Sequence, residues 1–404
     1  GHTGGHVAGM TKRTIILAGL ALRKAALRIA AAPLRLTAAD AALGGEGIRK
    51  ILFIRIDRVG DLVLSTPAIR ALKEGFPSSE LTVLAGPAAA PLLENNPRVD
   101  RVIVYDRAWS IRAKWALLHE LKRLRFDLAI DPYDDREMET AWIARATGAP
   151  QRIGYPCGGR EVFLTRVLER PAADQHVVET NLGALKPLGI PASGFRPEIF
   201  LSKSEVESAG RWLLREGGGA RSFVAIHPGA HYETQRWPAD YYAALADRLM
   251  QAGEYGIILF GGPGDEPILS RVLSRTSAHI VQCVTEDIRQ FAARLSQCRI
   301  LVCNNSGPLH VAVALGVPTV SFMGPTVRQR WYPRDGRHVV LRLDALACIG
   351  CNSGTCRIGT HDCMRGIRPE RVLGAISGAA GTLQFGHHHE WTGDGDHELH
   401  PLRG

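Results

Sequence analysis

One aspartate stands where an apolar run passes into a helical segment near the start of the folded chain. Asp61 follows Gly60 in the segment RIDRVGD (residues 55–61), shortly after the run ILFIRI. The dipole of a helix that begins there favours an ionised carboxylate, and a carboxylate at that position suits a general base. The structural alternative is a helix N-cap, because aspartate is one of the residues that most often occupy that position.

Three further junctions between strand and helix combine small residues with polar ones: HPGAH at 227–231, GGPGDE at 261–266 and NNSGPLH at 304–310. Small residues let a ligand approach the backbone, and N–H groups at a helix start bind phosphate oxygens. We therefore expect Ser306, Gly307 and Leu309 to hold a diphosphate. Asp265 or Glu266 would then bind ribose hydroxyls. Each turn alone is also compatible with tight packing, so the prediction depends on all three meeting at one sheet edge.

The elements that must position these residues alternate in the order of a parallel α/β protein. Short β-branched runs alternate with helical segments from residue 50 onward, and a second series of the same kind begins at residue 223. Strands that are apolar on both faces belong in parallel sheets covered by helices. We predict two Rossmann-like domains, 48–202 and 203–383, that face a cleft with ligands at the carboxyl ends of the strands.

The composition limits the partners of the chain. Its 404 residues are 45% hydrophobic and 22% charged, as in globular proteins, and the net charge of +9 favours an anionic partner. Nucleic acid is not expected, because the cations are dispersed and no aromatic-basic strand motif appears. The first junction lacks a G-x-G-x-x-G motif and the chain lacks a P-loop, which argues against a dinucleotide cofactor and a P-loop NTPase.

The two ends read differently from the body. Residues 1–47 include the segment 11–36, with six Lys or Arg residues and no acidic one, and predict an amphipathic helix that lies on an anionic membrane surface or packs on its own domain. No run of 18 uninterrupted apolar residues occurs, so no membrane span is expected. Residues 384–404 are polar and rich in Gly and His, which predicts a disordered tail.

Four cysteines gather within residues 348–363: Cys348, Cys351, Cys356 and Cys363. Four thiolates in so short a span are compatible with one structural zinc or iron ion, with two disulfides, or with free thiols. A four-cysteine site leaves no open coordination position, so its role would be structural. Trp109, Trp115, Trp142 and Trp212 are expected to pack in the interior rather than to serve as sugar platforms.

Three segments together resemble one protein family: RIDRVGDLVLSTPAIRALKEGFP, HPGAHYETQRWPADYYAALADRL and NNSGPLHVAVALGVPTVSFMGPT. They are similar, in order and separation, to glycosyltransferase family 9, the bacterial ADP-heptose:lipopolysaccharide heptosyltransferases. The resemblance covers residues 48 to 375 and implies a GT-B fold and inverting transfer that requires no metal. By position it implies that Asp61 is the catalytic base, that Ser306 and Gly307 hold the diphosphate, and that His310 lies beside it.

Two positions depart from the family pattern and concern the donor site. The family commonly has a lysine where this chain has Gln235, followed by Arg236. The aspartate often found before Ser/Thr-Gly is Asn305 here. We expect Arg236, or alternatively Arg328 or Arg330, to supply the missing cation.

The resemblance implies transfer of a heptose from ADP-heptose to an anionic, lipid-linked glycan acceptor such as a lipopolysaccharide core. The expected location is the cytoplasmic face of the inner membrane, as a peripheral protein. Two alternatives stay open at this point: a nucleotide-sugar epimerase of the same fold, and a catalytically degenerate sugar-binding protein. Neither the acceptor hydroxyl nor the number of chains in an assembly follows from the sequence.

Overall fold

The computed structural model describes residues 47–191, 194–220, 222–253 and 255–382. The amphipathic segment predicted at the N-terminus and the tail predicted from residue 384 lie outside the described residues. No helix in the described part of the chain is long and apolar enough to cross a bilayer.

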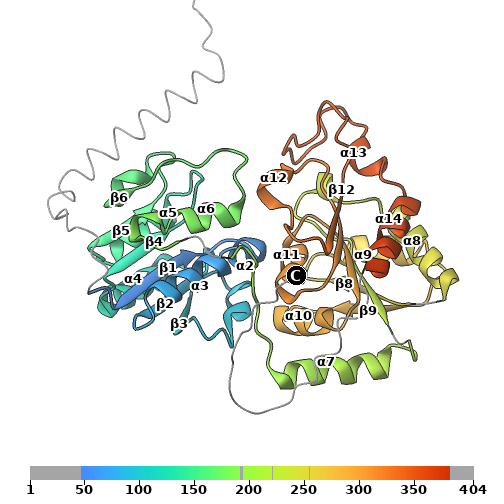
Figure 1. Cartoon of the computed structure of the whole chain (residues 1–404), viewed down its shortest axis with the longest axis horizontal. Coiled ribbons are helices and arrows are strands. Elements are labelled where there is room, and N and C mark those ends of the chain that lie inside the picture. The colour runs from blue at the N-terminus through green and yellow to red at the C-terminus, as the bar shows by residue number, and fades with distance from the viewer. Residues whose placement is uncertain (1–46, 192–193, 221, 254, 383–404) are drawn as a thin grey trace, which may run out of the picture.

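Two parallel sheets form the centres of two domains that lie side by side (Figure 1). The first sheet has the order β3-β2-β1-β4-β5-β6 and the second the order β12-β11-β10-β7-β8-β9. The strands of the first sheet are β1 (Lys50–Arg55), β2 (Glu80–Ala85), β3 (Arg101–Val104), β4 (Leu128–Asp131), β5 (Gln151–Gly154) and β6 (Arg166–Val167). Those of the second are β7 (Phe223–His227), β8 (Gly256–Gly261), β9 (Ile280–Val284), β10 (Ile300–Asn304), β11 (Thr319–Phe322) and β12 (His338–Leu341).

Helices cover both faces of each sheet. The first domain contains α2 (Val59–Val63), α3 (Thr66–Gly75), α4 (Ile111–Leu124), α5 (Glu139–Ala146) and α6 (Val177–Gly183), with 3-10 turns η2 (Ala90–Leu93), η3 (Arg160–Phe163) and η4 (Lys186–Leu188). The second contains α7 (Lys203–Glu216), η5 (Glu233–Gln235), α8 (Ala239–Ala252), α9 (Glu266–Leu273), α10 (Ile288–Ser296), α11 (Gly307–Leu315), α12 (Arg328–Trp331), α13 (Asp362–Arg365) and α14 (Pro369–Thr382).

The strand sequences explain this layering. In β1, Ile51 and Phe53 pack into one hydrophobic cluster while Leu52 and Ile54 pack into another. Successive side chains of a strand point to opposite faces of the sheet, so a strand that is apolar at every position needs helices on both sides. The continuous apolar runs therefore predict the three-layer arrangement correctly.

The two domains share part of a core. Val63, from α2, and Leu92, from η2, belong to the same buried cluster as Leu309 and Val313 of α11. Because α2 follows β1 and α11 follows β10, this contact brings together the carboxyl ends of the two sheets. The junctions after β1 and β10, which the sequence analysis singled out, thus face each other.

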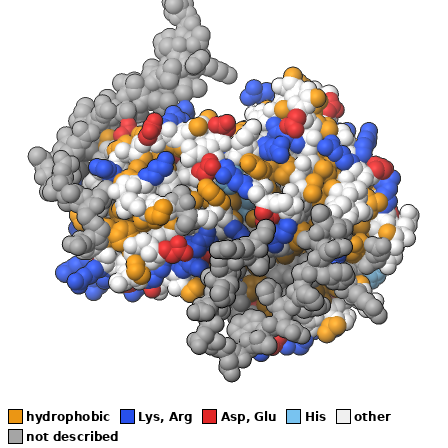
Figure 2. Space-filling model, viewed as in Figure 1, with side chains coloured by type: hydrophobic (Ala, Val, Ile, Leu, Met, Phe, Trp, Pro, Cys, Tyr) orange, Lys and Arg blue, Asp and Glu red, His pale blue; other side chains and the backbone are white. Residues whose placement is uncertain are grey.

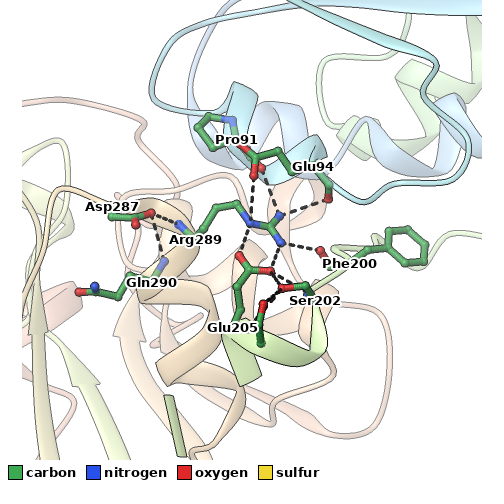
Figure 3. A network of polar contacts seen from close by, with 9 residues as sticks. Pro91, Glu94, Phe200, Ser202, Glu205, Asp287, Arg289 and Gln290 are labelled. Carbon is green, nitrogen blue, oxygen red and sulfur yellow. Dashed lines mark hydrogen bonds and ion pairs between the residues drawn. The ribbon is translucent and has the colours of Figure 1, made fainter. Parts of the chain in front are cut away.

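A buried arginine ties the domains together on one side of this contact (Figure 3). Arg289 of α10 donates to the carbonyl oxygens of Pro91 and Glu94 at 3.2 Å each, and to that of Phe200 at 2.8 Å. It also forms two hydrogen bonds with the carboxylate of Glu205, at 2.5 and 2.6 Å. The hydrogen bond from Arg289 lowers the pKa of Glu205 to about 2. One guanidinium therefore links η2, the connecting segment and α7.

A second set of contacts crosses between the domains at α12. Arg330 donates to Asp134 at 3.0 Å, and Arg334 donates to Glu179 at 2.7 Å. The His176 ring nitrogen Nε2 lies 3.1 Å from the carbonyl oxygen of Tyr332. Figure 2 shows cationic and acidic side chains next to one another where the two domains meet.

Candidate active site

A cleft of about 490 Å³ opens between the domains at the carboxyl ends of both sheets. Residues from the β1–α2 and β4–α5 junctions line one wall. Residues from the β7–α8 and β10–α11 junctions and from α12 line the other. Loops at the carboxyl ends of parallel strands are where α/β proteins bind their ligands.

Asp61 lies in the first turn of α2 and lines this cleft. The N-cap position belongs to Arg58, and no side chain caps the helix, so Asp61 does not act as an N-cap. The side chain of Asp61 is 18% exposed, and its Oδ1 lies 4.0 Å from Nη2 of Arg55. The carboxylate of Asp61 therefore faces the cleft, and both its burial and the nearby charges affect its pKa.

The pKa of Asp61 is raised to about 7. Burial is the largest cause, and the negative charge of Asp57 adds to it, while Arg55 and Arg58 act in the opposite direction. Burial disfavours the ionised form of a carboxyl group, and a like charge nearby does the same. A base with a pKa near the working pH transfers protons most effectively, so this environment suits general-base chemistry.

The opposite wall presents the start of α11. Ser306 occupies the N-cap position with an extended backbone and makes no capping hydrogen bond, and Gly307 follows it. A Cβ atom placed on Gly307 would lie 3.4 Å from Cβ of Val59, so the start of α11 abuts α2. Because no side chain caps α11, polar groups of Ser306 and Gly307 are available to bind an anion beside Asp61.

Leu309 differs from its prediction. Its side chain is fully buried, and its N–H group donates to the carbonyl oxygen of Ser306 at 3.0 Å. Pro308, which precedes it, has no N–H group. Of the three residues predicted to hold a diphosphate, Ser306 and Gly307 line the cleft and Leu309 does not.

His310 lines the cleft and packs between the two helices. A Cβ atom placed on Gly60 would lie 2.7 Å from Cδ2 of His310. Burial, with a smaller effect of His176, lowers the pKa of His310 to about 3, so the ring is neutral at physiological pH. His310 is therefore a neutral group at the cleft and does not supply the missing cation.

The two departures from the family pattern are both at the cleft. Gln235 lines it, and the side chain of Asn305 is buried with its Oδ1 lacking any hydrogen-bond partner among the described residues. Such a buried acceptor is costly unless a ligand satisfies it. Arg236 points elsewhere, because its Nε and Nη2 both donate to the carbonyl oxygen of Ala230, at 3.1 and 2.9 Å.

Three arginines line the cleft: Arg55, which lies beside Asp61, Arg58 and Arg330. Arg58 comes from the first domain and lies 3.0 Å from Nε2 of His231. Arg330 reaches across from α12. The sequence analysis expected Arg236, with Arg328 and Arg330 as alternatives, and of these three only Arg330 lines the cleft.

Asp265 and Glu266 do not line the cleft. Asp265 accepts a hydrogen bond from the N–H of Gly262 at 3.1 Å and lies 3.7 Å from Nε2 of His227. Glu266 is exposed in the first turn of α9. The interpretation of these two as ribose ligands stays a prediction.

Sequence reasoning missed an acidic group beside Asp61. Asp134 and Asp135 line the same cleft, from the loop that follows β4, and Tyr133 lies next to them. The hydroxyl oxygen of Tyr133 accepts a hydrogen bond from the N–H of Ile56 at 3.1 Å. The signal was present in the segment DPYDD directly after a strand, at the edge that also carries Asp61.

The cysteine cluster lies outside the cleft. Burial raises the pKa of Cys363 to about 11, and the other three cysteines are close enough to add to this electrostatically. Among the residues that the structure describes, no group of three or more His, Cys, Asp or Glu side chains is arranged to hold a metal ion. The structure joins none of the eight cysteines in a disulfide. The thiols gather without forming a ligand set, so a metal or disulfides at this cluster stay predictions.

Comparison with known proteins decides the family. The model of glycosyltransferase family 9 (heptosyltransferase) matches residues 114–361. The chain belongs to this family. It is 28% identical over 344 residues to lipopolysaccharide heptosyltransferase 2 of Escherichia coli, an alignment that covers 80% of this chain and 96% of the relative.

Solved structures of the family share the fold. A family 9 glycosyl transferase from Veillonella parvula superposes with a TM-score of 0.73 at 23% identity and covers 83% of this chain and 97% of its own. The E. coli ADP-heptose lipopolysaccharide heptosyltransferase II superposes with a TM-score of 0.69 at 24% identity, covering 82% and 99%. The prediction of a GT-B fold with two Rossmann-like domains is confirmed.

Proposed function

We propose that this family 9 enzyme transfers a heptosyl residue from ADP-heptose to a hydroxyl group of a lipopolysaccharide-type acceptor, with inversion at the anomeric carbon. The observation that carries the proposal is the placement of Asp61 on one wall of the cleft and of Ser306 and Gly307 on the other. The relatives named above, one of which carries ADP-heptose in its name, support the same donor and acceptor for this chain.

The proposed chemistry follows from the two walls. The carboxylate of Asp61 takes the proton of the acceptor hydroxyl as its oxygen bonds to the anomeric carbon. The bond between that carbon and the diphosphate oxygen breaks, and ADP leaves with the electron pair. Polar groups of Ser306 and Gly307, with the positive charges of Arg58 and Arg330, stabilise the charge that develops on the diphosphate.

The proposal includes transfer without a metal ion. Its support is the presence of three guanidinium groups and a helix start in the cleft, since these provide positive charge where a metal would otherwise be needed. Transfer should proceed at the same rate in the presence of excess EDTA. A rate that collapses with EDTA and returns with a divalent cation would contradict this part.

The experiment that tests the function is a transfer assay with ADP-heptose and a deacylated, heptose-accepting core oligosaccharide. The Asp61→Asn variant should lose at least about a hundredfold in turnover, the usual contribution of a positioned base. Its affinity for ADP should be unchanged, because Asp61 and the diphosphate groups lie on different walls. Full activity in the Asp61→Asn variant would exclude Asp61 as the base.

We further propose that the protein acts as a peripheral protein at the cytoplasmic face of the inner membrane. The net charge of +9 supports attraction to an anionic lipid surface. Fractionation of cells under low and high salt tests this, because an electrostatically held protein moves from the membrane to the soluble fraction as salt rises.

A further inference from the structure

Four large apolar side chains lie exposed on α4, on α5 and just before α4 in the first domain. They are Trp109 (37% exposed), Ile111 (76%), Trp115 (54%) and Trp142 (37%). The rings of Trp115 and Trp142 meet edge to face with their centroids 6.1 Å apart. We call these four residues the tryptophan face. The expectation of interior packing is not met for these three tryptophans, since each keeps more than a third of its surface exposed, whereas Trp212 is partly buried against a core cluster of the second domain.

The helix α4 already has another face that binds it to its own domain. Leu117, Leu118 and Leu121 are buried in the cluster that covers one side of the first sheet. Ile111 and Trp115 are four residues apart, so they are neighbours on the outward side of the same helix. An outward side that only met water would carry polar residues there. Packing of α4 on its own domain therefore leaves Ile111 and Trp115 unexplained.

Cations surround the tryptophan face. The helix α4 carries Arg112, Lys114, Lys122 and Arg123 against a single acidic residue, Glu120. Among the described residues, Arg112, Lys122 and Arg123 form no salt bridge, and all three are exposed. Figure 2 shows Lys and Arg side chains gathered on the part of the first domain where Figure 1 places α4.

We propose that the tryptophan face docks the first domain onto an anionic lipid bilayer. Tryptophan side chains favour the region of the lipid headgroups, where an apolar ring meets water, and Lys and Arg beside them attract anionic lipids. The exposed indole rings match the apolar part of an anionic bilayer surface, and the unpaired cations match its charged part. This docking rests on the proposed function, in which the acceptor is anchored in a lipid layer.

The topology of the first sheet places this face near the cleft. Trp109 follows β3, and α5, with Trp142, follows β4; both strands run parallel to β1, so their carboxyl ends lie at the edge that carries Asp61. The loop between β4 and α5 contains Asp134 and Asp135 of the cleft wall. A bilayer on the tryptophan face would thus lie at the rim of the acceptor wall, where a lipid-linked glycan has to enter.

The test is flotation of the full chain with vesicles of phosphatidylcholine alone or with about 30% phosphatidylglycerol. The double variant Ile111→Ser/Trp115→Ser should bind the anionic vesicles at least about tenfold more weakly. The variant Arg112→Gln/Arg123→Gln should lose at least about tenfold on anionic vesicles and little on neutral ones. Leu214→Ser is the matched control, because Leu214 is an 86% exposed apolar residue of α7 in the other domain, and its binding should not change.

A second readout separates this face from any other membrane contact of the full chain. Lipids brominated in the acyl chain should quench the fluorescence of the wild type, and this quenching should disappear in a Trp109→Phe/Trp115→Phe/Trp142→Phe variant. Unchanged flotation of both double variants together with unchanged quenching in the Phe variant would overturn the proposal. Self-association without lipid that Trp115→Ser abolishes would also overturn it, because the face would then bind a second copy.

Activity distinguishes a failure of this docking from a failure of the proposed function. The Ile111→Ser/Trp115→Ser variant should transfer heptose to a soluble, deacylated acceptor at the wild-type rate and lose activity on the same acceptor embedded in vesicles. If the wild type transfers heptose to neither acceptor, the proposed function fails, while flotation and quenching still decide the docking.

Discussion

Two of the charged neighbours of Asp61, Asp57 and Arg58, should shift the pH dependence of transfer in opposite directions. Asp57 raises the pKa of Asp61 and Arg58 lowers it. Replacing Asp57 by Asn removes a negative charge, so the pKa of Asp61 should fall. Replacing Arg58 by Gln removes a positive charge, so the pKa should rise. Each shift should be on the order of one pH unit, as expected for charges a few ångströms apart in a partly solvated cleft.

The wild-type profile sets the reference. With a pKa of about 7, the ionised fraction of Asp61 is about one tenth at pH 6 and about nine tenths at pH 8. Because the base acts as a carboxylate, kcat/KM should rise tenfold per pH unit below the midpoint and level off above it. This profile should be measured between about pH 5 and 9 with a neutral-sugar acceptor, so that no acceptor phosphate titrates in the same range.

The outcome that matters is the order of the three midpoints: Asp57→Asn lowest, wild type between, Arg58→Gln highest. If the three midpoints coincide, the rise of kcat/KM with pH reports the titration of another group, and the argument for Asp61 as the base fails. The plateau of Arg58→Gln should also fall, since Arg58 lines the cleft and in the proposed function stabilises charge on the leaving diphosphate. That effect changes the height of the profile and not its midpoint.

Stability gives an independent readout of the same pKa. A raised pKa means that the folded state holds the Asp61 proton more tightly than the unfolded state, so this group lowers stability as the pH rises from about 4 through 7. Asp61→Asn removes this cost and should therefore melt at a higher temperature than the wild type at pH 8. The difference should narrow as the pH falls and vanish below about pH 4, where both states are protonated. A lower melting temperature for Asp61→Asn at pH 8 would contradict the burial argument.

Three further variants and reagents test the packing of the structure. Gly60→Ala should lower turnover about tenfold or more, because its Cβ would lie 2.7 Å from His310, whereas Gly210→Ala, with nothing within 4 Å, should leave turnover unchanged. Arg289→Ala should lower the free energy of unfolding in urea by about 2 to 4 kcal/mol, because it removes a buried guanidinium. The exposed Arg211→Ala should lower it by at most about 0.5 kcal/mol. Equal losses of unfolding free energy in the two variants would refute a special role of the buried guanidinium. A thiol reagent should leave the four buried cysteines unmodified until the chain unfolds; these are Cys157, Cys283, Cys298 and Cys303. More than four reactive thiols in the native protein would contradict their burial. Elemental analysis and treatment with a chelator or a reductant then distinguish metal, disulfides and free thiols at Cys348–Cys363.

Part of the site could be read from local sequence. A β-branched run followed by a turn and a helix places a residue such as Asp61 or Ser306 at the carboxyl end of a strand, and neighbouring residues are enough to determine that. The family motifs then set these two residues opposite each other. For the same reason the two parallel sheets and their order along the chain were predicted correctly.

The direction in which individual side chains point could not be predicted from the sequence. Arg236 lies in the expected motif, yet the carbonyl oxygen of Ala230 holds its guanidinium away from the cleft. Arg330 reaches the cleft because α12 crosses to the first domain and pairs with Asp134. The predicted N-cap alternative for Asp61 failed because the helix begins earlier, at Val59, with Arg58 in the N-cap position.

The sequence by itself determined the strands, the helices and which junctions carry polar residues, because these depend on the period of apolar residues and on backbone preferences over a few positions. Only the tertiary structure decided the raised pKa of Asp61, the cation that faces it and the exposure of Trp115. Each of these depends on burial and charge contributed by residues far away along the chain, and no local pattern encodes how closely two such segments approach.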